Sequence, residues 1–278
     1  MSVVDSEFVT VDTQDPSADP TNGPTPTESS GGGDEESTPT GYFRWKGLID
    51  RVVASLLLLV AAPMIGILAV IVKLSSRGPA IFSQQRVGLN GTTYTMYKLR
   101  SMANNAEATT GPTWTTTNDV RVTPVGRILR TLHLDELPQL INVIKGEMSL
   151  IGPRPERPEF VEVLKDNVSR YCDRHKVRPG VTGLAQINLP PDTDLSSVRR
   201  KQYLDIEYIQ TANLWLDIRM FLCTLLGIFG LKGSCRFLGL RRHVPVEIDS
   251  DITTLTPQEI EQRNTSMLDE APKTVRPK

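Results

Sequence analysis

Apolar residues concentrate in one long run near the start of the chain. Residues 52–72 are 21 consecutive positions without a charged side chain. As a helix with a rise of ~1.5 Å per residue, this run is about 32 Å long, which matches the thickness of a bilayer core. Arg51 precedes the run and Lys73 follows it, so the flanking charges favour the same side of a membrane at both ends.

Pro63 lies in the middle of this run, where it removes one helical hydrogen bond and kinks the chain. We therefore predict a helix–break–helix hairpin over residues 41–78 that dips into one leaflet and returns, with the break at Ala62 and Pro63. Two alternatives stay open, namely a bitopic span with a proline kink and a buried helix of a soluble core.

After the apolar run the pattern changes to short strands. Residues 80–86 and 92–99 flank Asn90 and Gly91, a pair typical of tight hairpin turns, and we predict a β-hairpin there. The polar stretch over residues 103–121 is rich in Thr and Asn and predicts a long loop over a site.

Capping residues and apolar spacing predict helices in the rest of the chain, which indicates an α+β fold. Thr123 and Pro124 suit the start of a helix that continues through Leu132. Further helices are predicted over residues 135–145, 156–174 and 196–231. The last of them ends in twelve uncharged residues, too few to span a bilayer, and we expect that segment to pack on the core or lie in the membrane interface.

Counting charges by segment changes the view given by the whole chain. The 278 residues carry 31 Lys and Arg against 32 Asp and Glu, a net charge of −1. Residues 1–40 contain nine acidic and no basic residues, and residues 245–278 contain seven acidic and four basic residues. Residues 41–244 therefore stand at about +11. Such a basic body suits an anionic membrane surface and anionic substrates.

Composition and motifs exclude several classes of protein. The apolar content of the middle region excludes fibrous and wholly disordered proteins, and three cysteines are too few for a disulfide-stapled one. There is no GxxxxGK[ST] phosphate loop, dinucleotide fingerprint or HExxH motif, which argues against an ATPase, a Rossmann enzyme and a metalloprotease. Nucleic-acid binding is disfavoured because the basic residues are not interleaved with aromatic ones.

The three cysteines carry little functional signal. Cys172, Cys223 and Cys235 are scattered and lack the spacing of metal ligands. We expect them to be small apolar side chains in a reducing, cytoplasmic compartment.

Paired carboxylates with basic neighbours are the first candidate for chemistry. Asp135 and Glu136 lie in the string LDELPQL at a predicted helix start, where a carboxylate accepts backbone N–H bonds and stays ionised. Arg130 lies five residues upstream, and Lys98 and Arg100 close the predicted hairpin, so an anion could meet several donors. This combination suits phosphoryl transfer, in which the acid holds a divalent cation or attacks phosphorus. The alternative is that Asp135 is only a helix cap.

Two further basic clusters combine arginine with glycine and proline. Arg154 lies in GPRPERP, and Arg178 is followed by Pro179 and Gly180. Glycine lets a backbone approach a phosphate or nucleotide closely, and proline makes the turn rigid. Ordinary surface arginines beside turns are the alternative for each cluster.

Together, these strings resemble the bacterial sugar transferase family, the monotopic polyprenyl-phosphate phosphoglycosyl transferases, in their short form. The resemblance covers about residues 46–226. The strings that carry it are KGLIDR, YKLRSM, TPVGRILRT, LDELPQLINVIKGEMSLIGPRPE, VRPGVTGLAQIN and YIQTANLWLDIRM. Where the family often has Ser before the proline of the membrane helix, this chain has Ala62.

The resemblance implies a ping-pong transfer at the cytoplasmic face of the bacterial inner membrane. Asp135 matches the nucleophile, which attacks the β-phosphate of a UDP-sugar, releases UMP and forms an aspartyl phosphosugar. A polyprenyl phosphate, usually undecaprenyl phosphate, then takes the phosphosugar. The resemblance also implies Mg²⁺ held at Asp135, with Glu136 as a base or organiser and Arg130 holding phosphate. The nucleotide region corresponds to Arg154, Arg178, Pro179 and Gly180.

The expected organisation therefore has four parts. They are a disordered acidic tail over residues 1–40, a re-entrant membrane hairpin over 41–78, a catalytic domain with an interfacial C-terminal helix over 79–235, and a mostly disordered acidic tail over 236–278. The expected partners are a UDP-sugar, a polyprenyl phosphate and anionic lipid, and a homo-oligomer is left open. The alternative function is a non-enzymatic, membrane-anchored scaffold that binds anionic lipid. The sequence assigns neither the sugar nor the polysaccharide or glycoconjugate that is made.

Overall fold

The computed structural model describes residues 40–104, 106, 119–190, 195–228, 230, 231, 233–242 and 244. All of them belong to one compact unit, Glu35–Lys278. Its helices are α1 (Phe43–Ser75), α2 (Pro124–Thr131), α3 (Gln139–Lys145), α4 (Pro158–Asn167), α5 (Leu184–Asn188), α6 (Leu195–Thr211), α7 (Leu214–Ile228) and α8 (Ser234–Phe237). Three 3₁₀ turns are η1 (Leu89–Gly91), η2 (Leu134–Glu136) and η3 (Tyr171–Lys176). The strands are β1 (Ile81–Val87), β2 (Thr93–Leu99), β3 (Ser149–Ile151) and β4 (Gly180–Thr182).

These elements confirm the predicted α+β class. Residues 1–39 and 245–278, which include most of the two predicted tails, lie outside the described residues. The two sheets have two strands each, β1 antiparallel to β2 and β3 parallel to β4.

The predicted β-hairpin is confirmed. Ile81 at the start of β1 pairs with Leu99 at the end of β2. Asn90 and Gly91 have φ of 53° and 76°, the left-handed backbone that this tight turn requires. Most of the predicted long loop that follows lies outside the described residues, but a bridge between Met102 and Val122 closes its ends.

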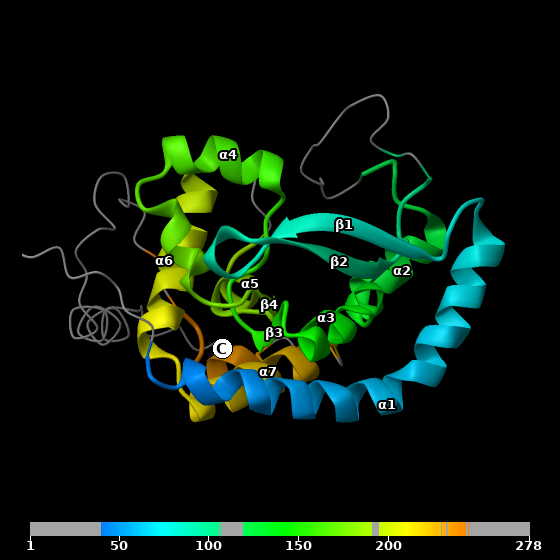
Figure 1. Ribbon diagram of the computed structural model, residues 1–278. Coiled ribbons are helices and arrows are strands. Elements are labelled where there is room, and N and C mark those ends of the chain that lie inside the picture. Colours follow the sequence, from blue (N-terminus) through cyan, green and yellow to red (C-terminus); the bar gives the residue numbers. More distant parts are fainter. Residues whose placement is uncertain are drawn as a thin grey trace, which may run out of the picture. The chain divides into compact units, whose positions relative to one another are not determined.

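α1 is a continuous helix that curves along one side of the domain (Figure 1). It continues through Ala62 and Pro63, so the break expected there is replaced by a bend within one helix. By length and composition α1 could cross a membrane. Ala54 and Ala61 on its inner face are buried against a cluster that includes Val143 of α3. Its outer face exposes large apolar side chains: Leu48, Val52, Leu56, Leu59, Val60, Ile67, Val70, Ile71 and Leu74.

The first turns of α1 are joined to the domain by a buried polar network. The ammonium of Lys46 forms ion pairs with Asp50, at 3.3 Å, and with Asp217 of α7. Asp217 also accepts hydrogen bonds from the hydroxyls of Tyr42, at 2.9 Å, and Tyr208, at 2.8 Å. The membrane-length helix is therefore fixed to α6 and α7 at its N-terminal end.

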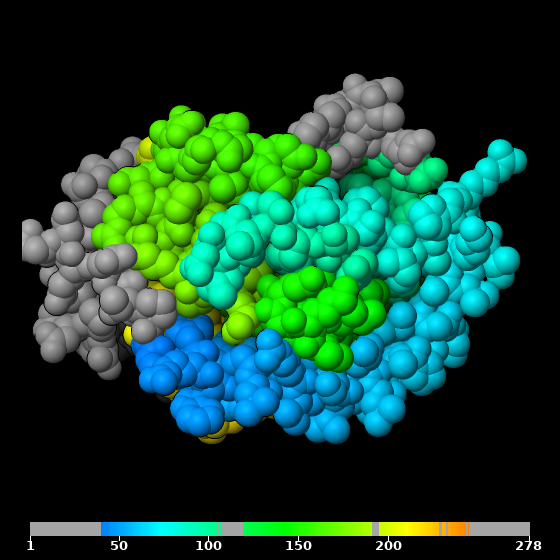
Figure 2. Space-filling view, viewed as in Figure 1, coloured from blue at the N-terminus to red at the C-terminus, as the bar shows by residue number. Residues whose placement is uncertain are grey.

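The opposite end of α1 is joined to the same domain. Arg100, directly after β2, donates hydrogen bonds to the carbonyl oxygens of Val72, at 3.2 Å, and Ser76, at 2.8 Å. Val72 is buried with Leu99 and Leu129 in one cluster. Both ends of α1 therefore contact one globular unit, while α3 fills the space between the hairpin and α1 (Figure 2).

The largest core cluster lies where α6 and α7 pack against the β3 region. Leu204 and Ile209 of α6 are fully buried there with Met220 of α7, Leu184 of α5 and Ile151 of β3. The other side of α7 is exposed and apolar. Its exposed side chains are Leu214, Trp215, Ile218, Leu222 and Leu225. One face of α7 thus packs on the core and the other is left free of it.

Two of the predicted helices are wrong in extent. The helix expected over residues 156–174 is divided into α4 and η3, because Val168 is extended and Arg170 is left-handed with φ of 54°. The helix expected over residues 196–231 is divided into α6 and α7. Asn213 starts the second of these, since its side-chain oxygen accepts the Leu216 N–H at 2.9 Å.

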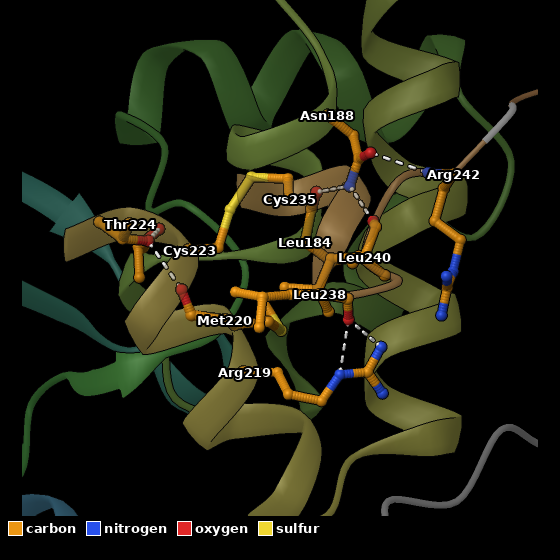
Figure 3. The surroundings of a disulfide bond; sticks show 11 residues. Leu184, Asn188, Arg219, Met220, Cys223, Thr224, Cys235, Leu238, Leu240 and Arg242 are labelled. Atoms are coloured by element: carbon orange, nitrogen blue, oxygen red, sulfur yellow. Dashed lines mark hydrogen bonds between the residues drawn. A yellow bond between two sulfur atoms is a disulfide. The ribbon is translucent and has the colours of Figure 1, made fainter. Parts of the chain in front are cut away.

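The domain extends beyond residue 235, where we predicted its boundary. Leu240 is fully buried, and its carbonyl accepts a hydrogen bond from Asn188 at 3.0 Å (Figure 3). Asn188 also accepts the N–H of Arg242 at 2.8 Å, and Arg219 of α7 donates to the Leu238 carbonyl at 2.7 Å. The segment after α8 is thus held on α5 and α7 and completes the core.

The expectation for the cysteines is also corrected. A disulfide joins Cys223 of α7 to Cys235 of α8, with Cα atoms 5.2 Å apart (Figure 3). Cys172 is free and exposed. The cysteines therefore no longer support the reducing compartment that their scattered spacing suggested.

Candidate active site

The paired carboxylates lie on a tight turn between α2 and α3. Thr123 caps α2 as predicted, accepting the Gly126 N–H at 2.9 Å. His133 then takes a left-handed conformation, with φ of 53°, and reverses the chain into η2, which carries Asp135 and Glu136. α3 begins only at Gln139, so the helix start predicted at Asp135 is wrong: Pro138, which lacks an N–H, precedes α3.

Asp135 is buried but has no partner among the described residues. Its side chain accepts no hydrogen bond from them, although the residue is only 5% exposed. It is therefore not a helix cap, contrary to the alternative considered above. Burial raises the pKa of Asp135, and nearby positive charges oppose that shift. These charges belong to Lys98, Arg130 and Arg154.

Glu136 is held by two of these cations. Its Oε1 accepts hydrogen bonds from Lys98 Nζ, at 2.7 Å, and from Arg154 Nη2, at 2.9 Å. Burial alone would raise the pKa of Glu136, but Arg154 and Lys98 outweigh it and hold that pKa well below its usual range. Glu136 is therefore ionised at physiological pH, and its charge is occupied by the two cations.

The structure divides the predicted phosphate-binding residues into two groups. Lys98, Arg130 and Arg154 lie around the carboxylates, as their effect on the pKa of Asp135 shows. Arg100 lies elsewhere, because its guanidinium binds the last turn of α1. Arg178 also lies elsewhere.

Arg178 contacts α1 and the end of α3. Its Nε donates to the Gly146 carbonyl at 2.8 Å. A Cβ added to Gly47 of α1 would lie 2.8 Å from Arg178 Nη1, so the guanidinium reaches the helix surface. Arg178 is thus a packing contact between α1 and α3, and no described contact joins it to the two carboxylates.

The glycines of the two Gly/Pro segments bring the segments against each other. A Cβ on Gly180 would lie 2.1 Å from the backbone nitrogen of Gly152, and one on Gly183 would lie 2.2 Å from the Gly152 carbonyl oxygen. Pro179 contributes its carbonyl, which accepts the Ser149 N–H at 2.8 Å. In this structure the glycines let the two backbones pack against each other. We predicted a different role for them, in which the backbone approaches a phosphate closely.

Arg174 is a supporting residue that the sequence reasoning did not identify. It is buried, and its guanidinium donates to the Arg154 carbonyl and to Asp205 of α6. Asp205 lies 31 positions away along the chain. No local pattern connects two residues at that separation, so only the packing of α6 reveals the pair.

The residues present fit a magnesium ion that is bound mainly by substrate and water. The described residues contain no group of three His, Cys, Asp or Glu side chains that could form a metal cage. Mg²⁺ often takes one or two carboxylates and completes its octahedron with water and phosphate oxygens. Asp135, whose oxygens have no partner here, suits that role, whereas Glu136 already binds two cations.

This arrangement suits phosphoryl transfer. A buried carboxylate without a partner lies beside three cations, and one of them, Arg154, has a side chain that is 40% exposed. Cations fixed around a reacting phosphoryl group stabilise the charge on its oxygens. Asp135 can therefore act as a nucleophile or as a metal ligand, and the cations beside it supply the positive charge that such a reaction needs.

Comparison with known proteins identifies a family whose sequence model matches this chain. The family model described as "Bacterial sugar transferase" matches residues 41–230. An undecaprenyl-phosphate glucose phosphotransferase of Komagataeibacter xylinus is 42% identical over 188 residues, 65% of this chain and 35% of the relative. A UDP-glucose:undecaprenyl-phosphate glucose-1-phosphate transferase of Caulobacter vibrioides is also 42% identical over 188 residues, 65% of this chain and 68% of the relative.

A third relative is named for a different sugar. It is a UDP-N-acetylgalactosamine-undecaprenyl-phosphate N-acetylgalactosaminephosphotransferase of Aeromonas hydrophila, 41% identical over 188 residues, 68% of this chain and 44% of the relative. The match spans 35% to 44% of the length of several curated relatives, less than two thirds of each.

Proposed function

This chain belongs to the bacterial sugar transferase family, and we propose that it transfers a sugar 1-phosphate from a UDP-sugar to a polyprenyl phosphate. The names of the relatives support both substrate classes. Those names cover glucose and N-acetylgalactosamine, so the proposal assigns no particular sugar. The observation that carries it is the buried Asp135 carboxylate, which has no partner among the described residues and lies beside three cations.

Asp135 is the nucleophile of the proposed mechanism. A carboxylate oxygen forms a bond to the β-phosphorus of the UDP-sugar, and the bond from that phosphorus to the bridging oxygen breaks, releasing UMP. An oxygen of the polyprenyl phosphate then attacks the aspartyl phosphosugar. The carboxylate of Asp135 leaves, and a polyprenyl diphosphate sugar is formed. Burial favours this role because it removes the water that weakens a carboxylate nucleophile.

The cations around Asp135 have separate roles. Arg130 neutralises the phosphoryl oxygens, since its positive charge opposes the raised pKa of Asp135 and no ion pair joins it to an acid among the described residues. Lys98 and Arg154 hold Glu136 ionised and fix its position beside the nucleophile. When bound, Mg²⁺ would be held by Asp135 and would neutralise charge on the diphosphate.

We further propose that the enzyme lies at the cytoplasmic face of the bacterial inner membrane, with α1 re-entrant. A spanning helix needs its ends on opposite sides, but the network of Lys46 and the contacts of Arg100 join both ends of α1 to one domain. The exposed apolar faces of α1 and α7 would enter the leaflet, and the basic body would face anionic lipid. This brings the carboxylates near the height of the lipid phosphate.

Isotope exchange tests the mechanism. Purified protein with Mg²⁺, a UDP-sugar and labelled UMP, without polyprenyl phosphate, should move label into the UDP-sugar. Each of several UDP-sugars is tried in turn. Asp135→Asn should abolish this exchange, while Asp166→Asn, an exposed acid of α4, should retain it. Mass spectrometry should find the phosphosugar on the peptide that contains Asp135.

Three results would contradict the proposal. UMP release by Asp135→Asn at the wild-type rate would show that Asp135 is not the nucleophile. Product formation in the presence of polyprenyl phosphate, together with no exchange of labelled UMP in its absence, would exclude the covalent intermediate. Lipid binding with no UMP released from any UDP-sugar would favour the non-enzymatic scaffold instead.

A further inference from the structure

The segment that presents Arg154 is held by its carbonyl oxygens. Prolines 153 and 155 have no N–H, so most of the hydrogen bonds that fix this segment must come to its carbonyls from elsewhere. Four consecutive carbonyls are satisfied in this way. Pro153 accepts from Gly180 N at 2.8 Å, Arg154 from Arg174 Nη2 at 2.8 Å, Pro155 from Arg86 Nη1 at 3.1 Å and Glu156 from Val87 N at 2.9 Å.

Arg174 is the most constrained of these donors. It is 2% exposed, and its guanidinium donates to the hydroxyl of Tyr171, at 2.7 Å, and to Asp205, at 2.7 Å, as well as to Arg154. Because a guanidinium is planar and has five donors in fixed directions, these acceptors determine its position. Arg174 thus links η3, α6 and the Arg154 segment.

A second buried ion pair supports the same segment at Glu156. Glu156 pairs with Lys201 of α6, and Arg86 lies 3.8 Å from the same carboxylate. This pair fixes the residue that follows Pro155, but it does not reach Arg154 itself. Arg174 therefore supplies the side-chain contact to the backbone of Arg154.

We propose that Arg174 is a positioning residue: its bond to the Arg154 carbonyl fixes the backbone from which the Arg154 guanidinium reaches Glu136 at 2.9 Å. The Arg154 side chain is 40% exposed, so its direction depends on a rigid backbone more than on surrounding side chains. This inference rests on the proposed function, in which Arg154 and Glu136 belong to the catalytic site.

The test compares two variants that weaken the same buried ion pair. Arg174→Lys keeps a positive charge opposite Asp205, but a single ammonium cannot reach Tyr171, Asp205 and the Arg154 carbonyl together. Asp205→Asn keeps the guanidinium and its bond to Arg154. We expect Arg174→Lys to lower the rate of UMP release by about 10- to 100-fold, the scale of a small misplacement of a catalytic group, and Asp205→Asn to lower it less than about 3-fold.

A double-mutant cycle separates positioning from a merely structural role. If Arg174 acts through Arg154, then Arg174→Lys should cause no further loss in an Arg154→Ala background. Because Arg174→Lys and Asp205→Asn weaken the same buried ion pair, both are expected to lower the thermal midpoint, by amounts within a few degrees of each other. Equal fold losses of Arg174→Lys in the two backgrounds would overturn the proposal, and so would full turnover by Arg174→Lys.

Hydrogen exchange gives a readout that does not depend on activity. The amides of Gly152, Arg154, Glu156 and Arg157, the residues of this segment that have an N–H, should exchange faster in Arg174→Lys than in the wild type or in Asp205→Asn. If the wild type releases no UMP from any UDP-sugar, the proposed function fails, but this exchange still reports on Arg174. Unchanged exchange over residues 152–157 would overturn the positioning role whatever the activity.

Discussion

Replacing Lys46 with methionine should strongly destabilise the protein and make its stability depend on pH. The ammonium of Lys46 is 2% exposed and pairs with both Asp50 and Asp217. Methionine has a similar length but no charge, so Lys46→Met leaves two buried carboxylates without their cation. Removing one partner of a buried pair costs about 3–5 kcal/mol. For a domain of this size that corresponds to a fall in thermal midpoint of about 6–20 °C.

The pH dependence follows from Asp217. Burial already raises its pKa, and Lys46 is the largest influence that opposes this rise. In the variant the folded pKa should move further above the unfolded value of ~3.9. A raised folded pKa stabilises the fold when the group is protonated, and that stability is lost as pH rises through the folded pKa. The variant should therefore recover stability relative to the wild type as pH falls from neutral.

Thermal unfolding in lipid nanodiscs, followed by circular dichroism between pH 7 and pH 4.5, measures both effects. Arg44→Met is the matched control, because Arg44 is an exposed basic residue on the same helix, and it should change the free energy of unfolding by less than about 0.5 kcal/mol. A Lys46→Met variant as stable as Arg44→Met would refute the assigned burial. A large loss that stays constant with pH would refute the role of the unpaired carboxylates.

Three further predictions concern a glycine of β4, the left-handed His133 and the half-buried His175. Gly180→Ala should lower the free energy of unfolding, measured by denaturant titration, by about 1–3 kcal/mol or more, because the added Cβ meets the Gly152 backbone. The control Gly227→Ala, which has open space around it in α7, should be neutral or stabilising by up to ~1 kcal/mol. His133→Gly should raise the thermal midpoint, because the left-handed backbone at this position costs a non-glycine residue about 1 kcal/mol and glycine adopts it without that cost. A lower midpoint would contradict this. Burial and the charge of Arg174 lower the pKa of His175 to about 4, so stability present above pH ~6.5 should fall by up to about 3 kcal/mol as pH drops toward 4. His175→Asn should remove this part of the pH profile.

Features that depend on neighbouring residues were predictable. Asn90 and Gly91 require a left-handed turn whatever surrounds them, and the hairpin forms where they predict it. Thr123 caps α2 by a bond to a residue three positions away. The adjacency of Asp135 and Glu136 and the nearby Arg130 likewise identified the candidate site from the sequence.

Element boundaries were less predictable, because weak local signals compete there with tertiary packing. Apolar spacing favoured one helix through residues 196–231, but Asn213 starts a new one whose inner face packs on α5, β3 and β4. Asp135 looked like a helix cap, yet the left-handed His133 and the missing N–H of Pro138 place it on a 3₁₀ turn.

The sequence by itself determined the apolar helix, the hairpin, the basic body and the family, because each depends on local composition or on strings read in order. Only the tertiary structure decided which acceptor each long basic side chain reaches. Arg100 and Arg154 were equal candidates for phosphate binding, but one binds the end of α1 and the other binds Glu136. A guanidinium can extend over several ångströms in many rotamers, so its partner is set by the elements that pack around it, and those come from distant parts of the chain.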